Sequence, residues 1–440
     1  MPVEQRAGFI TEMADLIPIA NSWIIGLRID GAALNEAEQS LSEEFNDIIK
    51  QLAISASVIS SPKQLGALLF VTWGLKAHSK TPTGTASTSK DDLKWIHYNL
   101  LKENQIDAAE KLNLLLRAKT IATLQSKYVK TTKLALDHTT DGYIYGAPRI
   151  FGTYTGRMTY SNATLRKYKT GIALHQMPRR AKQIRKFIIA PESYMIYEAD
   201  ASGQESRLMA LKSKDRTMIT IFQDDLNFHS MTGASIISME YTEFEIARKL
   251  EDDTGYYTEQ RQFGKLTNLS CNYRIGGKSL SEKAFVNYDT FMDVRTGMHL
   301  VNTFNKTYSG VPDFWDNAIE FARTTGYAEA YGGLRFKIFD WHNNRWASES
   351  SAINLPIQGS GASMKEIAIL ETYKKEPRAK FILDLHDASF FYIPIKDSKE
   401  IIKNLDNILN TIDYLPYWGF TPEIPLPYES KHGNSFADVK

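Results

Sequence analysis

A short apolar segment that leads directly into an aspartate and then into a helix-forming stretch constrains this chain more than any other feature. Residues 195–197 predict a buried strand, and Asp200 lies where that strand is expected to end. Gly203 loosens the backbone after it, and good helix formers follow from Glu205. A carboxylate in this position is suited to a hard cation such as Mg²⁺. Most strand-end aspartates cap the next helix or bind water instead, so a metal site here requires a partner for Asp200.

A second aspartate lies at the bend of the clearest predicted β-hairpin. Residues 380–395 form two apolar arms around His386 and Asp387. If this hairpin is next to the strand that ends at Asp200, two carboxylates meet at one edge of a sheet. Two hard cations about 3.5–4 Å apart, bridged by such aspartates, can activate a 3′-hydroxyl and stabilise a leaving pyrophosphate. An ordinary turn aspartate is the alternative interpretation of Asp387.

A stripe of cations on a predicted helix supplies groups that can bind an anion. Arg261, Lys265, Leu269 and Tyr273 recur every four residues and therefore share one slowly drifting helix face. Cations followed by an aromatic residue favour contact with a triphosphate and a base pair. A solvated face with one buried tyrosine is the alternative.

Positive charge is concentrated in one part of a nearly neutral chain. The net charge is only +1, which argues against a protein that coats nucleic acid along its whole surface. Residues 157–186, however, contain nine Lys or Arg residues and no acidic residue. This stretch favours a groove that follows a phosphate backbone, with a solvated basic loop as the alternative.

Composition limits the remaining classes. The 440 residues, 43% hydrophobic and 23% charged, have the balance of a globular protein with two to four subdomains. No apolar run reaches the roughly 18–20 residues of a membrane span, and the N-terminus lacks the apolar core of a signal peptide. The single cysteine, Cys271, allows no internal disulfide, so we expect a reducing, cytoplasmic compartment.

Local patterns predict helices and strands in separate stretches. Ser61 and Pro62 are typical of the N-cap and first turn of a helix. We expect helices over residues 1–60, 91–137 and 206–350, a short strand and turn at 26–31, and strand-like structure at 141–160.

Three of these stretches, in order, resemble motifs A, B and C of the A-family DNA polymerases. DASGQESR at 200–207 resembles the family's DxSxxExR, the stripe from Arg261 to Tyr273 resembles RxxxKxxx(F/Y)xxxY, and LHDA at 385–388 resembles VHDE. Five further segments fall in family order, at residues 61–70, 155–157, 308–311, 354–359 and 427–433. Eight motifs in the right order leave little room for chance.

The resemblance implies an α+β right-hand fold with an antiparallel palm sheet, helical fingers and a helical thumb. The expected parts are an N-terminal lead-in at residues 1–50 that packs on the palm, and the thumb at 51–140. The first part of the palm follows at 141–205, the fingers at 206–345 and the second part of the palm at 346–440. It implies a template-directed DNA polymerase that adds deoxynucleoside triphosphates to a primer 3′ end and releases pyrophosphate.

The resemblance also assigns residues by position. Two Mg²⁺ ions, for which Mn²⁺ can substitute, would be bound by Asp200, Asp387 and the backbone carbonyl of Ala201, and Lys265 would act with the two aspartates in catalysis. The incoming nucleotide would contact Arg261, Lys265, His229, Glu205, Tyr273 and Leu269. Primer–template DNA would contact Arg157, Gln358, Asn354, His386, Arg179 and Arg180. Glu205 would exclude a ribose 2′-hydroxyl, and Tyr273 would lie against the nascent base pair.

The expected partners are primer–template DNA and deoxynucleoside triphosphates, for a protein that acts as a monomer and without a membrane. The sequence identifies no processivity factor, and a bacterial or phage source fits it. Residues 26–31 lie near the start of the family's polymerase module, and no second acidic cluster is apparent, so we expect no 3′–5′ exonuclease in this chain.

Four positions depart from the family pattern. Leu269 replaces an aromatic residue beside the incoming nucleotide, Arg274 replaces a glycine, Ser350 replaces an arginine and Ala388 replaces the acid of motif C. These departures favour, as a second interpretation, a specialised polymerase for lesion bypass or unusual bases. A third interpretation, a catalytically inactive primer–template binding module, would not need both metal aspartates.

Overall fold

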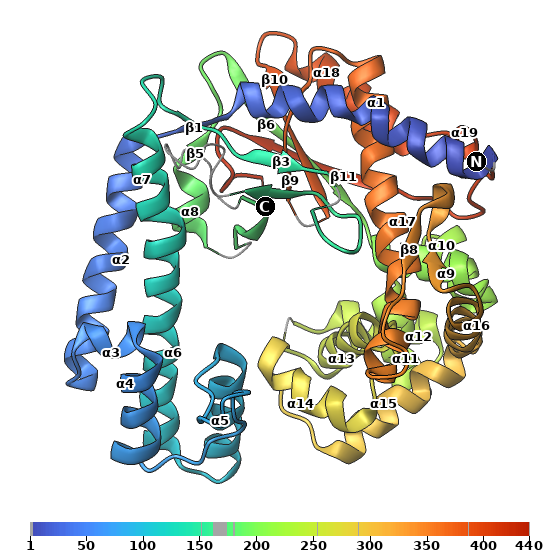
Figure 1. Cartoon of the computed structure of the whole chain (residues 1–440). Coiled ribbons are helices and arrows are strands. Elements are labelled where there is room, and N and C mark those ends of the chain that lie inside the picture. The colour runs from blue at the N-terminus through green and yellow to red at the C-terminus, as the bar shows by residue number, and fades with distance from the viewer. Residues whose placement is uncertain are drawn as a thin grey trace.

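The computed structural model describes residues 3–439 except 151, 162–173, 179–180, 253, 289 and 386, with the side chains of 3–12 and 161 also outside the description. Helices surround four small sheets, and every strand pair among the described residues is antiparallel (Figure 1). This arrangement confirms the α+β class. No helix in the described part is long and apolar enough to cross a membrane.

A four-stranded sheet lies at the centre of the fold. Its order is β11-β6-β10-β9, with bounds Tyr428–Gly433, Tyr194–Ala201, Ala388–Pro394 and Lys380–Leu385. The apolar residues of β10 are buried almost along its whole length, because helices cover the sheet. The predicted hairpin at 380–395 is confirmed. The predicted strand at 195–197 is also confirmed, but it continues through Asp200 to Ala201 because β10 and β11 pair with it on both sides.

Smaller strands and several helices complete this part of the molecule. The three-stranded sheet has the order β2 (Tyr143–Ile144), β1 (Leu27–Ile29) and β5 (Ile188–Ile189). One two-stranded ribbon pairs β3 (Ala147–Arg149) with β4 (Thr159–Ser161), and the other pairs β7 (Tyr327–Glu329) with β8 (Arg335–Lys337). The adjoining helices are α1, α8, α9, α17, α18 and α19, with bounds Val3–Ile25, Lys182–Lys186, Gln204–Ser213, Arg345–Lys375, Ser398–Asn410 and Leu415–Trp418. Short 3₁₀ turns lie at η3, Leu174–Gln176, and η4, Tyr331–Gly333.

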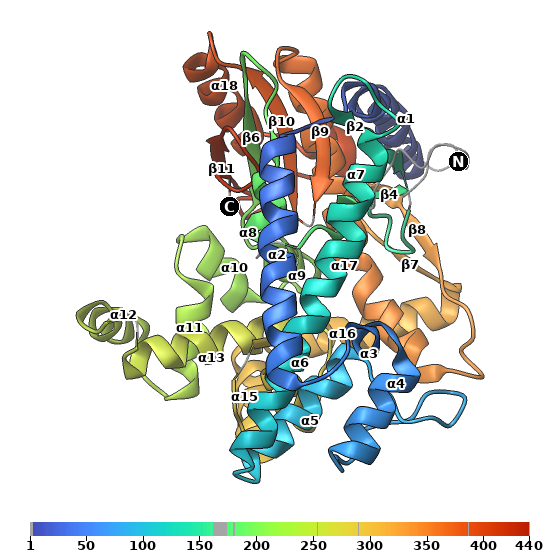
Figure 2. The same cartoon turned by 90° about the vertical axis from the view of Figure 1, so that its left-hand side faces the viewer.

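The first helical arm, which we call the α2–α7 arm, projects from one side of the sheet. It consists of α2 (Gly31–Leu52), α3 (Ala56–Ser60), α4 (Pro62–Gly66), η1 (Ala67–Thr72), α5 (Lys90–Lys102), α6 (Ile106–Leu124), η2 (Gln125–Val129) and α7 (Lys130–Leu136). Helices α2 and α6 run side by side (Figures 1 and 2). The predicted cap is confirmed, because the Ser61 hydroxyl accepts a hydrogen bond from the Gln64 backbone N–H at 3.3 Å.

The second helical part, the α10–α16 lobe, lies on the opposite side. Its helices α10 to α16 have bounds Arg216–Gln223, Phe228–Ile236, Tyr241–Leu250, Tyr256–Cys271, Gly277–Tyr288, Val294–Thr307 and Gly310–Thr325. Helices α11 and α13 pack closely because glycines lie at their crossing. A Cβ on Gly264 would be 2.2 Å from the His229 carbonyl oxygen, and one on Gly233 would be 2.9 Å from that of Gln260. The crossing therefore holds His229 against the cationic helix.

The tip of the α2–α7 arm contacts the α10–α16 lobe. The Tyr98 ring on α5 lies 5.3 Å from the Phe285 ring on α14 and stacks on Phe291 at 5.1 Å. Its hydroxyl donates to the Met292 carbonyl at 3.4 Å, and Lys94 donates to the Val286 carbonyl. We call this contact the clasp. Together with the sheet at the other ends of the two parts, it closes a circuit of contacts.

Candidate active site

The two strand-end aspartates lie next to each other in the central sheet. The backbone N–H of Ala201 donates to the Asp387 carbonyl at 3.2 Å, and Ala388 pairs directly with Asp200. On its other side, Asp200 pairs with Glu429. Side chains of directly opposite residues project from the same face of a sheet. The structure therefore brings together the strand ends that the sequence had placed about 190 residues apart.

Arg157 links two carboxylates of the site. Its Nη2 lies 3.1 Å from Glu205 Oε1 and 3.6 Å from Asp387 Oδ1. All three side chains are about one-quarter to one-third exposed, so water screens these pairs and their net stabilisation is small. Asp387 thus lies beside a cationic side chain, in a pair that contributes little to stability.

Tyr273 completes this cluster. Its hydroxyl donates to Glu205 Oε2 at 2.7 Å. Burial, followed by the Glu205 carboxylate, raises the pKa of the Tyr273 hydroxyl, while a hydrogen bond with the Gln358 side chain opposes the rise. Arg157, Glu205, Tyr273, Gln358 and Asp387 thus form one contiguous polar cluster, which we call the central cluster.

The predicted helical stripe is wrong at its last residue. Helix α13 ends at Cys271, so Arg261, Lys265 and Leu269 lie on the helix while Tyr273 follows it. The Asn272 carbonyl accepts a hydrogen bond from the Trp315 indole at 3.1 Å, which fixes the chain as it leaves the helix. This exit directs Tyr273 toward Glu205.

The cations of α13 lie beside a neutral histidine. Burial, then Arg261 and Lys265, lowers the pKa of His229 to about 4. Its Nδ1 lies 3.2 Å from Asn268 Nδ2 on the same face of the crossing. Two cations and an imidazole that is neutral at physiological pH provide donors for an anion such as a triphosphate.

Asn354 and Gln358 lie one turn apart on α17. Gln358 contacts Tyr273, as described above. The Oδ1 of Asn354 is buried and has no hydrogen-bond partner among the residues that the structure describes. A buried acceptor without a partner is costly, so this atom is available to a ligand donor.

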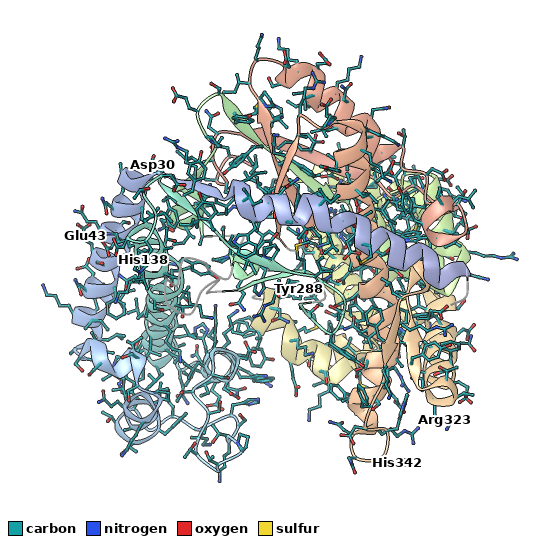
Figure 3. All side chains as sticks on the ribbon, turned by 45° about the horizontal axis from the view of Figure 1, so that its top comes forward. Asp30, Glu43, His138, Tyr288, Arg323 and His342 are labelled. Carbon is teal, nitrogen blue, oxygen red and sulfur yellow. The ribbon has the colours of Figure 1, made fainter. Side chains whose placement is uncertain are left out.

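A pocket of about 450 Å³ opens beside the central cluster. Leu269, 37% exposed, lines it with Tyr273, Arg274 and Tyr288. Tyr288, the last residue of α14, is labelled near the centre of Figure 3. Trp346, 78% exposed, also lines the pocket and was not predicted as a site residue. Trp346 falls inside the 206–350 stretch expected to be helical, where no pattern marks it as a site residue.

Arg274 adopts an unusual backbone conformation at the edge of this pocket. Its φ of +58° lies in the left-handed region that favours glycine. Its Nη1 lies 3.0 Å from Glu349 Oε2, and Arg345 Nε binds the other oxygen of Glu349 at 2.7 Å. Ser350 also lines this pocket.

The expected basic groove is only partly described. Arg179, Arg180 and His386 lie outside the described residues, as do Arg166, Lys167 and Lys169. Arg185 is 2% exposed, and its Nε donates to the Phe436 carbonyl at 2.7 Å. This member of the stretch belongs to the core, which corrects its assignment to a phosphate-binding surface. Arg207 is likewise buried and donates to the carbonyls of Ser202 and Pro425.

The donor set at the two aspartates suits a hard cation. Carboxylate and carbonyl oxygens are the ligands that Mg²⁺ prefers. No group of three or more His, Cys, Asp or Glu residues gathers to hold a metal ion in the described part of the chain. A metal at this position would therefore rely on two carboxylates together with backbone and substrate oxygens.

Comparison with known proteins identifies the family. The family model described as DNA polymerase family A matches residues 31–438. The chain belongs to DNA polymerase family A. The geometry of the central cluster can therefore be read against the family motifs.

Similar curated proteins are bacterial DNA polymerase I sequences. The chain is 25% identical over 434 residues to DNA polymerase I of Caldicellulosiruptor bescii and 25% identical over 426 residues to that of Bacillus subtilis. Both alignments cover 94% of this chain but only 45% and 44% of those relatives, so the chain spans less than half of their length.

A solved structure confirms the right-hand fold. The POL domain of Pol1 from M. smegmatis, in complex with DNA primer-template and dNTP, superposes with a TM-score of 0.78 at 22% identity. The match covers 97% of this chain and 70% of that domain chain. Within the family A pattern, Ala388 leaves Asp200 without a neighbouring acid on β10, whereas Glu429 lies opposite Asp200 on β11.

Proposed function

We propose that this chain is a template-directed DNA polymerase that adds deoxynucleoside triphosphates to a primer 3′ end. The observation that supports this most directly is the central cluster, in which Arg157 contacts both Glu205 and Asp387. Family membership and the DNA polymerase I relatives support the same activity. The solved M. smegmatis domain was captured with DNA primer-template and dNTP, the ligands that this proposal requires.

Asp200, Asp387 and the carbonyl of Ala201 would hold two Mg²⁺ ions. When bound, these ions supply activation of the primer 3′-hydroxyl and stabilisation of the leaving pyrophosphate. The cation position beside Asp387 is filled here by the Arg157 guanidinium, which supports the fit of a positive charge at this carboxylate. The Arg157 guanidinium group would then contact the primer terminus.

The cations of α13 would receive the triphosphate. Arg261 and Lys265 neutralise negative charge as it develops on the pyrophosphate, and Lys265 thereby acts in catalysis. His229 stays neutral above its pKa of about 4 and donates a hydrogen bond to a phosphate oxygen. Positive charge is thus concentrated where the leaving group departs.

Glu205 and Tyr273 would select the sugar and the base pair. The Glu205 carboxylate, held by Arg157 and Tyr273, occupies space that a ribose 2′-hydroxyl would need. Tyr273 would lie against the nascent base pair. Arg157, Gln358 and Asn354 would reach minor-groove acceptors, which are similar in all four pairs and therefore report pairing geometry.

The right-hand parts follow from the same proposal. Residues 51–140 would form the thumb, 206–345 the fingers, and 141–205 with 346–440 the palm. Helix α2 lies beside α6, so part of the expected 1–50 lead-in accompanies the thumb. Arg179, Arg180 and His386 would add DNA contacts. The polymerase would work as a monomer, with no membrane, in a cytoplasmic compartment.

Primer extension with single nucleotides tests the proposal. With Mg²⁺ or Mn²⁺, the protein should add only the nucleotide complementary to the template, and ribonucleotides should be rejected. Asp387→Ala should abolish extension while primer–template binding, measured by fluorescence anisotropy, is retained. Asp397→Ala serves as the control, because Asp397 is exposed beyond the opposite end of β10 from Asp387 and its side chain caps no helix. Binding without any extension by the unaltered protein would support the inactive binding module instead.

A specialised polymerase is the second candidate, because Leu269 is 37% exposed in the pocket where the family has an aromatic ring. Without that ring, discrimination against a missing 3′-hydroxyl should change. We expect the ratio of deoxy- to dideoxynucleotide incorporation to differ several-fold between the protein and Leu269→Phe. Equal ratios would contradict this, and extension past abasic or mismatched templates would measure lesion tolerance directly.

A further inference from the structure

A buried ion pair lies directly beneath the central cluster. Lys365 Nζ on α17 lies 2.9 and 2.8 Å from the two carboxylate oxygens of Asp384 on β9. The two side chains are only 4% and 7% exposed. Asp384 is a charged residue inside an otherwise apolar strand, the one sequence signal that could have drawn attention to the pair. They lie outside the residues to which the family motifs assign a role.

A tyrosine joins this pair from a third element. Strand β9 is at the edge of the four-stranded sheet, so one side of it has no neighbouring strand. There, the Asp384 backbone N–H donates to the Tyr160 hydroxyl on β4 at 3.0 Å. Tyr160 is 3% exposed, and its own backbone N–H donates to His175 Nδ1 at 3.0 Å. Asp384 is therefore held on its side chain by one element and on its backbone by another.

Each of the three joined elements contains or directly adjoins a residue of the proposed reaction centre. Tyr160 follows Arg157 by three residues, and Asp384 precedes Asp387 by three. Lys365 follows Gln358 by seven residues, which is two helical turns, so both lie on one face of α17. The buried contacts thus join the three chain segments that lead to Arg157, Asp387 and Gln358.

We propose that Lys365, Asp384 and Tyr160 form a positioning junction that fixes the metal-binding Asp387 relative to the primer-contacting Arg157 and Gln358. The proposal rests on the proposed polymerase function. None of the three residues touches substrate or the reacting atoms, so they are positioning residues. They act through the short segments that lead from the junction to the reaction centre.

The chemistry of the pair favours positioning over stability. A buried ion pair gains little over well-packed apolar side chains, because taking both charges out of water is costly. The ion pair does, however, fix the relative position of Lys365 and Asp384, since both carboxylate oxygens must contact the ammonium group. An apolar pair at 365 and 384 could slide by an ångström or more without penalty. Displacements of that size are enough to slow a two-metal reaction strongly.

The test separates geometry from stability with a neutral double variant. Lys365→Met and Asp384→Leu alone each leave a buried charge without its partner, so both should unfold at lower denaturant concentration than the unaltered protein. The double variant, Lys365→Met with Asp384→Leu, should recover that midpoint. Its maximal extension rate should nevertheless remain at least tenfold lower, and half-maximal activity should require several-fold more Mg²⁺. Its KM for the nucleotide should change less than twofold, because Arg261 and Lys265 lie on α13.

A second readout does not depend on turnover. Mn²⁺ binding to the complex with a dideoxy-terminated primer, followed by electron paramagnetic resonance, should be several-fold weaker in the double variant. Tyr160→Phe, which removes the acceptor hydroxyl but keeps the ring, should shift both readouts in the same direction. Lys212→Met is the matched control, because Lys212 is a partly buried lysine that donates to the Glu329 carbonyl outside the junction. It should leave the Mg²⁺ requirement unchanged.

A double variant that regains stability together with the full extension rate and Mn²⁺ affinity would overturn the junction. The same result would leave the proposed function intact. Conversely, absence of extension by the unaltered protein would overturn the proposed function before any variant is compared.

Discussion

Arg274 has a backbone conformation that is unfavourable for a residue with a side chain. A non-glycine residue in the left-handed region costs about 1 kcal/mol or more relative to glycine. The pair between Arg274 and Glu349 returns little of this, because the Arg274 side chain is 46% exposed. The ion pair therefore does not explain the residue by stability, and its side chain lies at the rim of the Leu269 pocket.

Arg274→Gly should stabilise the fold by up to about 1 kcal/mol, because glycine adopts this φ without strain. The midpoint of urea unfolding measures the change. Arg274→Ala removes the same ion pair but keeps the strained φ, so it should be less stable than Arg274→Gly. Equal midpoints for the two variants would show that the backbone at this position is not strained.

His229 links stability to pH. Its folded pKa of about 4 lies below the ordinary histidine value of about 6.5, so the unfolded chain binds more protons between these values. The contribution of His229 to the free energy of unfolding is therefore fully present above pH 6.5 and falls as the pH drops toward 4. His229→Gln should flatten this part of the curve of stability against pH. A curve as steep as that of the unaltered protein would contradict the assignment, and His342→Gln, on an exposed loop, is the control.

At the scale of elements, the crossing of α11 and α13 places the cations that we propose to bind the nucleotide. The crossing depends on the two glycines that let the helices approach. A Cβ on Gly264 would lie 2.2 Å from the His229 carbonyl oxygen, which is far closer than real contacts allow. His229, Arg261 and Lys265 are thus held in one arrangement by packing rather than by hydrogen bonds among themselves.

Gly264→Ala should force α11 and α13 apart and cost about 1–3 kcal/mol, the range for overpacked cores. It should also raise the KM for the nucleotide, because His229 moves away from the two cations. Gly31→Ala at the start of α2, away from the crossing and the pocket, is the control, since a Cβ there meets nothing within 4 Å. Identical nucleotide KM values for the two variants would separate the crossing from nucleotide binding.

The elements predicted from the sequence were those with strong local signals. The hairpin at 380–395 and the Ser61 cap follow from apolar alternation and capping chemistry, and both are confirmed. The four-residue periodicity predicts Tyr273 on the helix, but periodicity alone does not show where a helix ends. Here the end is set by a tertiary contact, the hydrogen bond between Trp315 and the Asn272 carbonyl. The Lys365–Asp384 pair and the pocket residue Trp346 depend on packing between distant elements, which residue spacing cannot supply.

At the scale of the whole molecule, the clasp joins the α2–α7 arm to the α10–α16 lobe. Its aromatic contacts involve Tyr98, Phe285 and Phe291, and Phe291 is 49% exposed even in this closed arrangement. An aromatic pair contributes about 0.5–1.5 kcal/mol beyond the area it buries. A contact of this strength joins the two parts by only a small free energy, so a single substitution can weaken it.

Tyr98→Ala should open the clasp and shorten the DNA made in one binding event. Distances between spin labels at Lys102→Cys and Glu282→Cys measure the opening, and the native Cys271 is buried and should not react. Product lengths in the presence of trap DNA measure processivity. Tyr98→Phe keeps the ring and loses only the bond to the Met292 carbonyl, so it should resemble the unaltered protein. Unchanged distances and product lengths in Tyr98→Ala would rule out a mechanical role for the clasp.

A closed circuit of contacts has a topological consequence for the proposed polymerase. If primer–template DNA runs between the two parts, a linear duplex can enter from its free end, whereas a covalently closed circle is admitted only while α5 is separated from α14. Loading on a primed circle should then be limited by the rate at which Tyr98 leaves Phe285, independent of DNA concentration once DNA is abundant. Once the two parts met again, the protein and the circle would be linked like two rings, and dissociation would have to wait for the same separation.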